Sequence, residues 1–358
     1  MPRRGAAALA ALSCLVATAG PARASVERRW VVMGTYASVE VYAKDQARAE
    51  AAIEGIRTVF ARVDAAMSNW SPASELSALN REAGRREYPV QDPDLYRCIA
   101  LALDFARLTD GAFDPTVGPL MRVHGFRPRV ARDPSAAETA EAARHVGFWR
   151  VILDRAARSV RFTDPAVELD LGGIAKGLAL DLVLPVLARS DCQAALIDLG
   201  GELYAWRSPP GAAGFTIGVR DPLEGSAIVG ALTIENRAVS TSGNYENSLE
   251  EGGRTIGHLM DPTTGQPAES AVLAATVFAD RGADADALST ALLVAGPSRA
   301  PAILARSPGA EAVLVVREER GVVLLASASL AGRFRVEPGF LARSGGQVRY
   351  TLPPAPPG

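Results

Sequence analysis

The chain has 358 residues, of which 48% are hydrophobic and 22% charged, and its formal net charge is −2. This length suits one large domain or two closely packed lobes, and the near-neutral charge excludes a global field that would attract nucleic acid or anionic membrane. With three histidines and no C-x-x-C pair, the sequence argues against a His-rich zinc site. Beyond the first 24 residues only Cys98 and Cys192 remain, which excludes a disulfide framework and leaves one disulfide open.

The first 24 residues have the order of an export signal. Two arginines at positions 3 and 4 precede an apolar run, Ala6–Ala19, and Ala22-Arg-Ala24 forms a small-x-small cleavage site. The run is too short to span a membrane in the mature protein. We therefore expect a signal peptide over 1–24 and a soluble periplasmic protein. Membrane association would require lipidation at Cys14, but apolar residues continue past Cys14, where a lipobox cysteine would end the run.

Hydrophobic periodicity predicts alternating strands and helices along the first half of the mature chain. Strand alternation covers Trp30–Tyr42, and helical spacing covers Gln46–Met67 and Asp92–Leu108. The segment Phe126–Ser135 is rich in arginine and proline, and we expect it to form an exposed excursion. Two short apolar strings around residues 155–158 predict a hairpin.

The second half continues this alternation. Further strands are predicted at 166–171, 194–199, 215–219, 231–234 and 271–278, followed by a hairpin over 312–317 and 321–326. A helix is predicted over Ala283–Leu304 with a break at Gly296-Pro297. The proline-rich end, 346–358, is expected to be disordered. The mixture argues for α/β (α+β mixed) architecture, with a single domain over 25–345.

A glycine turn joins a predicted strand to a predicted helix. Asp170-Leu-Gly-Gly-Ile-Ala-Lys-Gly177 follows the strand at 166–171 and precedes the apolar run Leu178–Leu187. Glycines let the backbone approach a ligand, and unpaired N–H groups at a helix start favour an anion such as phosphate. Lys176 adds positive charge. The string is neither a Walker loop nor a dinucleotide fingerprint, and a Gly-Gly turn is also a common helix entry, so by itself it leaves both interpretations open.

Asp286 and Thr290 lie four residues apart at the start of the last long predicted helix, on one helical face. A carboxylate and a hydroxyl so placed supply two hard oxygen ligands, which suits Mg²⁺. The alternative is an N-terminal cap with a partly buried threonine.

Three loops carry further candidates. His258 precedes a turn and could act as a base near neutral pH, or serve only the loop structure. Trp70 could stack on a flat ring or form a half-buried surface anchor. The turn-dense loop Gly111–Leu120 offers backbone donors, a carboxylate and an aromatic face.

Nine short strings in this chain resemble, in the same order, those of the FAD:protein FMN transferases, the ApbE family. They are Met33–Thr35, Met67–Trp70 with Ser74–Asn80, Gly111–Leu120, Asp170–Gly177, Asp198–Gly201, Val219–Pro222, Ser240–Gly243, His258–Gly265 and Ala285–Thr290. Each string is weak singly, but their order spans nearly the whole mature chain.

The resemblance implies a two-lobed fold with FAD in the cleft between the lobes. It implies Mg²⁺-dependent transfer of FMN from FAD to a threonine hydroxyl of an acceptor protein, through a phosphoester bond, with release of AMP. By position, the implied metal ligands are Asp286, Thr290 and a backbone carbonyl best aligned with Gly173. The implied FAD contacts are Met33, Trp70, Ala112, Phe113, Asp114, Asp170, Lys176 and Met260. His258 matches a histidine considered as the base, beside Asp286 as the second catalytic residue.

Departures from the family pattern are modest: Trp70 replaces a commoner tyrosine, Ala73 a frequent acidic residue, and Leu178 a frequent aromatic. The acceptor implied is an exported flavin-carrying redox subunit, such as one of a sodium-pumping NADH:quinone or Rnf-type complex. Two alternatives remain open: an FAD pyrophosphatase that uses water in place of threonine, and a non-catalytic FAD-binding protein. The Asp286–Thr290 pair speaks against the second, because redox use of flavin requires no Mg²⁺.

Overall fold

The computed structural model describes residues 25–127, 130, 132–243, 249–251, 254–345 and 347–353. The expected signal peptide, with Cys14, and residues 354–358 lie outside this part of the chain. The α-helices are α1 (Gln46–Met67), α2 (Glu75–Glu82), α3 (Pro93–Leu108), α4 (Gly118–Val123), α5 (Ala136–Ala143), α6 (Ala175–Arg189), α7 (Gly282–Ala305) and α8 (Pro338–Ser344).

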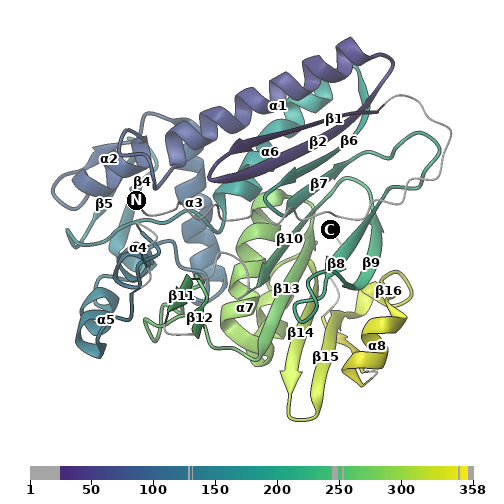
Figure 1. Cartoon of the computed structure of the whole chain (residues 1–358). Coiled ribbons are helices and arrows are strands. Elements are labelled where there is room, and N and C mark those ends of the chain that lie inside the picture. The colour runs from purple at the N-terminus through teal and green to yellow at the C-terminus, as the bar shows by residue number, and fades with distance from the viewer. Residues whose placement is uncertain are drawn as a thin grey trace, which may run out of the picture.

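A nine-stranded sheet forms the centre of the molecule (Figure 1). In spatial order its strands are β1 (Ser25–Val32), β2 (Thr35–Ala43), β6 (Cys192–Leu199), β7 (Glu202–Trp206), β10 (Arg237–Gly243), β13 (Val272–Ala279), β14 (Glu311–Glu318), β15 (Gly321–Ser327) and β17 (Val348–Leu352). Neighbouring strands are antiparallel except β15 and β17. The predicted mixed architecture is confirmed, with an antiparallel sheet at its core.

Three smaller sheets surround it. They are β3 (Tyr88–Pro89) with β5 (Ser159–Phe162) and β4 (Val151–Asp154), β16 (Arg335–Val336) with β9 (Ile228–Ile234) and β8 (Phe215–Arg220), and β11 (Leu249–Glu251) with β12 (Arg254–Ile256). In Figure 1, α2 to α5 and the β3–β5–β4 sheet lie on the left, away from β8, β9, β16 and α8 on the right.

The central strands of the large sheet are buried on both faces: side chains alternate along each strand, and each face packs against a hydrophobic core. In β14, Leu314 faces the core shared with α1, α6 and α7, whereas Val313 and Val315 face the core shared with β8, β9 and α8. Helix α7 therefore lies inside the molecule. By length and composition it could cross a membrane, but more than half of its most apolar stretch is buried in the fold. Its predicted break is confirmed at Gly296, where φ is 74°.

Four expectations need correction. The alternating run Trp30–Tyr42 is a hairpin, because a two-residue turn at Met33 and Gly34, with φ of 51° and 70°, reverses the chain. The predicted strand at 166–171 does not join a sheet: Ala166 lies in a turn, and Glu168 forms an isolated parallel bridge with Val117.

The other two corrections concern segments expected to be exposed or disordered. Phe126, the first residue of the expected excursion, is 4% exposed, because it packs with the buried Leu120 and Met260. The described residues 130, 132, 133 and 135 are exposed, as predicted for the rest of this segment. The sequence predicts a disordered tail from residue 346, yet residues 348–352 form β17 alongside β15. Its alternating Val-Arg-Tyr-Thr-Leu suits a sheet edge, so the domain extends to at least Leu352.

Candidate functional site

A cavity of about 330 Å³ opens between the helix starts at the large sheet and the loops of the α2–α5 region. Every site residue predicted from the sequence lines it: Met33, Trp70, Ala112, Phe113, Asp114, Asp170, Gly173, Lys176, His258, Met260, Asp286 and Thr290. Residues from distant parts of the chain thus meet at one place.

The hairpin between β1 and β2 supplies one side of the cavity. Met33 has the positive φ that non-glycine residues rarely adopt, and its N–H donates to Asp64 Oδ2 at 3.1 Å. A Cβ added to Gly200, in the next hairpin of the sheet, would lie 2.5 Å from Thr35 Oγ1. The close approach of these two turns therefore requires a glycine at 200.

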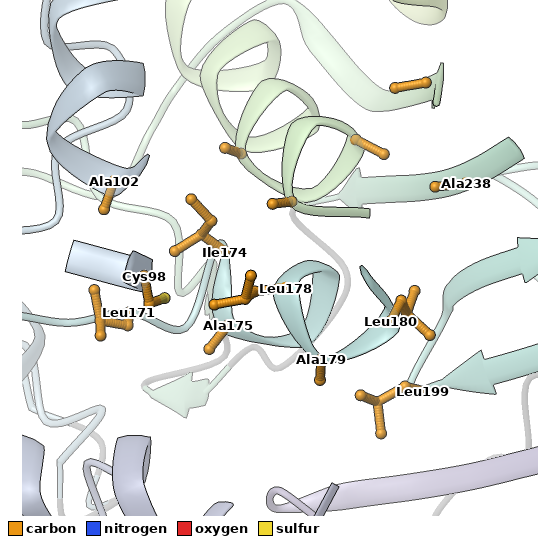
Figure 2. Close-up of a cluster of buried hydrophobic side chains, with 14 of the residues drawn as sticks. Cys98, Ala102, Leu171, Ile174, Ala175, Leu178, Ala179, Leu180, Leu199 and Ala238 are labelled. Carbon is orange, nitrogen blue, oxygen red and sulfur yellow. The ribbon is translucent and has the colours of Figure 1, made fainter. Parts of the chain in front are cut away.

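The glycine turn rests on an apolar floor. Figure 2 shows Leu171, Ile174 and Leu178 clustered with Cys98 of α3. Ahead of the turn, the Asn80 amide donates to Leu169 O at 3.0 Å and accepts from Leu169 N at 2.9 Å. This two-point contact fixes the extended segment and aims the turn at the cavity.

The start of α6 differs from the expected array of unpaired N–H groups. Ala175 N donates to Leu171 O at 2.8 Å, and Gly177 N donates to Asp286 Oδ2 at 2.9 Å. A carboxylate of the protein therefore occupies part of the place that the sequence suggested for a phosphate. The two helices approach closely at Gly177: a Cβ added there would lie only 2.2 Å from Gly282 O, so a larger residue would force them apart.

The capping between α6 and α7 is reciprocal. Asp181 of α6 accepts from Gly282 N at 2.5 Å and from Ala283 N at 3.1 Å, both at the start of α7. Each helix thus supplies the carboxylate that satisfies N–H groups at the start of the other. Burial raises the pKa of Asp181 to about 6, against the lowering effect of these two N–H groups.

Asp286 and Lys176 face each other across the cavity floor. Asp286 is 2% exposed, and burial raises the pKa of its carboxyl, while Lys176 and the Gly177 N–H act in the opposite direction. Lys176 Nζ lies 2.9 Å from Glu202 Oε1 and 3.9 Å from Asp286 Oδ1. The lysine is therefore held between two carboxylates, and Glu202 is a cavity residue that the sequence did not single out.

Thr290 lies at the cavity surface above a group of hydroxyls. Its Oγ1 is 3.4 Å from Ser242 Oγ, which in turn is 2.9 Å from Ser289 Oγ. A Cβ added to Gly173 would lie 3.2 Å from Thr290 Oγ1, so the glycine turn passes directly over the threonine. Ser242 belongs to the string Ser240–Gly243, one of the nine that resemble the ApbE family, and it lies on β10.

Asp114 is committed to its own loop. Its carboxylate accepts from Thr116 N and Oγ1 at 2.8 and 2.6 Å and from Phe148 N at 2.9 Å, and burial raises its pKa. These bonds hold the adjacent Phe113 ring against the glycine turn, where a Cβ on Gly173 would lie 3.2 Å from a ring carbon. The loop's contribution to the cavity is therefore a fixed aromatic and backbone surface.

Asp170 has an unforeseen partner. Its Oδ1 accepts from Asn69 Nδ2 at 3.0 Å and from Gly172 N at 2.8 Å, and its Oδ2 pairs with Arg127. Arg127 also donates to Glu168 at 2.7 Å and lines the cavity. It was missed because it falls in the Arg/Pro-rich segment expected to be exposed, and no local pattern distinguishes it from its neighbours.

The opposite wall is made of loops. Trp70 is 54% exposed, His258 is half-buried, and Met260 is buried and bridges to Pro267. The ring of His124, buried in α4's C-cap, donates from Nε2 to Gly265 O at 2.9 Å and anchors this loop.

Two other predictions have plain outcomes. The string Val219–Pro222 does not contribute to the described cavity lining, since Asp221 turns inward and accepts from Leu223 N. Cys98 and Cys192 are buried and free, so the disulfide left open by the sequence does not form in this structure.

The fold and the cavity define a mixed α/β protein whose site combines a buried carboxylate, hydroxyls and a glycine turn at two helix starts. The model of the ApbE family matches residues 33–314. The chain belongs to the ApbE family, which confirms the resemblance seen in the nine strings.

Named relatives agree with this assignment. The chain is 35% identical over 327 residues to an FAD:protein FMN transferase of Treponema pallidum, covering 86% of this chain and 88% of the relative. It is 32% identical to that of Rhodobacter capsulatus, covering 88% of this chain and 60% of the relative.

Solved structures match as well. The ApbE protein of Thermotoga maritima superposes with a TM-score of 0.75 at 30% identity, covering 90% of this chain and 99% of that one. The apo flavinyl transferase ApbE of Pseudomonas stutzeri gives 0.76 at 29% identity, covering 87% and 97%.

Proposed function

We propose that this protein is an FAD:protein FMN transferase that binds FAD in the described cavity. It joins the FMN half to a threonine hydroxyl of an acceptor protein. The observation that carries the proposal is the convergence of Asp286, Thr290 and the glycine turn on one cavity wall. The names of its relatives support the same reaction.

The donors present suit Mg²⁺. A carboxylate, a hydroxyl and a backbone carbonyl are hard oxygen ligands, and we assign them to Asp286, Thr290 and Gly173. A Cβ at residue 173 would lie 3.2 Å from both Thr290 Oγ1 and a Phe113 ring carbon, so a larger residue there would require these side chains to shift. When bound, the ion would offset negative charge that develops on the pyrophosphate oxygens.

The protein's own groups position the reactants. Lys176, which is held between Glu202 and Asp286, is the ammonium that we assign to the pyrophosphate of FAD. Trp70 and Phe113 offer aromatic faces for the isoalloxazine ring, beside Met33, Ala112 and Met260.

The reaction requires one proton transfer. The threonine oxygen forms a bond to the FMN phosphorus, the bond from that phosphorus to the bridging oxygen breaks, and AMP leaves. We assign the hydroxyl proton to the imidazole of His258, which lines the cavity. A threonine hydroxyl is a weak nucleophile, so this assistance matters.

We further propose that the protein works after export, on an exported flavin-carrying redox subunit. The leader-like order of residues 1–24 supports this proposal. Lipidation at Cys14 would anchor the protein to the membrane.

The test incubates the mature protein with FAD, Mg²⁺ and an exported domain of a sodium-pumping NADH:quinone or Rnf-type complex. Intact masses of both proteins are then measured. We expect the acceptor to gain one FMN phosphoester, and an acceptor whose target threonine is replaced by alanine to gain none. Free FMN and AMP with several unmodified acceptors would instead identify a pyrophosphatase, and unchanged FAD a binding protein.

A further inference from the structure

The hydroxyls of Ser240, Ser242 and Ser289 form a group next to Thr290 and determine which way its O–H bond points. Ser289 Oγ donates to Asp286 O at 2.9 Å, which uses its single proton. Ser289 Oγ also lies 3.1 Å from Ser240 Oγ and 2.9 Å from Ser242 Oγ. Because Ser289 has no further proton to give, both of these serines donate to it, and its two lone pairs are filled.

The same accounting extends to the cavity surface. Once Ser242 donates to Ser289, its oxygen can only accept. Thr290 Oγ1 lies 3.4 Å from Ser242 Oγ, which is longer than a typical O–H···O hydrogen bond. Because Ser242 can only accept, Thr290 is the donor in this weak contact. The lone pairs of Thr290 Oγ1 are then free to face Gly173 and the cavity.

We propose that Ser242 is a positioning residue for the metal site. Its oxygen accepts a hydrogen bond from the Thr290 hydroxyl, and this turns the lone pairs of Thr290 Oγ1 toward the cation. A neutral hydroxyl can ligate a cation only with its proton turned away. The inference rests on the proposed function, because it requires a metal ion at Asp286 and Thr290.

The fold supplies its own control. Ser240 and Ser242 are two residues apart on β10 and therefore face α7 together. Ser240 makes the same kind of contact to Ser289 but is 1% exposed and does not line the cavity. A change at Ser240 removes a hydroxyl from the same group without removing the acceptor for Thr290.

The experiment titrates Mn²⁺, a paramagnetic ion that also suits oxygen ligands, into the mature protein with bound FAD. Free Mn²⁺ is read by EPR. Losing one neutral hydrogen bond should weaken Mn²⁺ binding about fivefold in Ser242→Ala. Ser242→Thr keeps the accepting oxygen and should bind within about twofold of wild type, as should Ser240→Ala. Thermal unfolding of each variant verifies folding, and the half-saturating Mg²⁺ concentration for FMN transfer should rise in the same ratio as the Mn²⁺ dissociation constant.

Thr290→Ala separates the two levels of the argument. If it weakens Mn²⁺ binding while Ser242→Ala does not, the role of Ser242 is overturned and the proposed function stands. If neither variant affects Mn²⁺ binding, Thr290 is not a ligand and both assignments are overturned. Equal weakening by Ser240→Ala and Ser242→Ala would also overturn the proposal, since it would reflect general loosening of the hydroxyl group.

Discussion

The two walls of the cavity are built in different ways. On the helical wall, Asp286 is 2% exposed and accepts an N–H from α6, while Asp181 returns the same contact to α7. On the loop wall, Trp70 is 54% exposed and His258 is half-buried. Hydrogen bonds from backbone N–H groups to carboxylates join the two helices of the helical wall, whereas the loop wall consists of turns.

The difference matches the demands of the proposed chemistry. Groups that must be held to fractions of an ångström are best placed on helices that fix one another. Groups that admit a large planar substrate and a protein acceptor are best placed on loops. Changes on the helical wall should therefore affect turnover and stability together, whereas a change at the exposed Trp70 of the loop wall should affect FAD binding and leave stability unchanged.

The strongest test of the helical wall is Asp286→Asn. Asparagine keeps an acceptor for the Gly177 N–H but removes the only carboxylate assigned to the metal, so we expect transfer to slow roughly 10²–10³-fold. Initial rates from intact acceptor mass at several Mg²⁺ concentrations give the measurement. A rate within a few-fold of wild type at saturating Mg²⁺ would remove Asp286 from the ligand set.

A second prediction concerns pH. The pKa of Asp181 is raised by burial from 3.8 to about 6, so the native state holds this proton to higher pH than the unfolded chain does. Its contribution to the free energy of unfolding therefore falls as pH rises from about 4 to about 6, on the order of 3 kcal/mol in total.

Asp181→Asn, which cannot ionise, should lack this fall. Urea unfolding at pH 4.5 and 7.5 compares it with wild type, and Asp191→Asn, at a side chain 74% exposed, is the matched control. Identical pH profiles for wild type and Asp181→Asn would show that burial does not raise the pKa of Asp181.

A third prediction concerns the close packing of α6 against α7 at Gly177. A Cβ on Gly177 would lie 2.2 Å from Gly282 O, so Gly177→Ala should cost about 1–3 kcal/mol of stability through overpacking. FMN transfer should fall with it. Gly225→Ala, where an added Cβ meets nothing within 4 Å, controls for the substitution itself. Equal stability of the two variants would mean that the contact between α6 and α7 is looser than described.

The smallest effect is expected on the loop wall. Trp70→Ala should weaken FAD binding about tenfold through lost stacking, with unfolding unchanged because the side chain is largely exposed. Quenching of flavin fluorescence gives the dissociation constant. Trp149, 67% exposed and outside the described cavity lining, provides the matched alanine control. A large loss of stability in Trp70→Ala would blur the distinction between the walls.

Local sequence patterns predicted many residues of the site, but they could not predict contacts between residues far apart in the sequence. Spacing put Asp286 and Thr290 on one face of a helix, and glycines marked the turn at Gly173, because both signals are contained within a few residues. The roles of Asp181, Arg127 and Ser242 depend on partners far along the chain, so no local pattern reveals them. The N–H groups of α6 were misjudged for the same reason: their carboxylate partner lies 109 residues away.

Reciprocal capping of α6 and α7 also determines when, during synthesis, the proposed site can form. A nascent chain that has completed the glycine turn still lacks the carboxylate for Gly177 and the helix that Asp181 caps. Under the proposed function, the metal site would therefore form only after α7 (Gly282–Ala305) has been synthesised and has docked against α6. If the proposed site is correct, a chain truncated before α7 would lack Asp286 and Thr290 and should not transfer FMN.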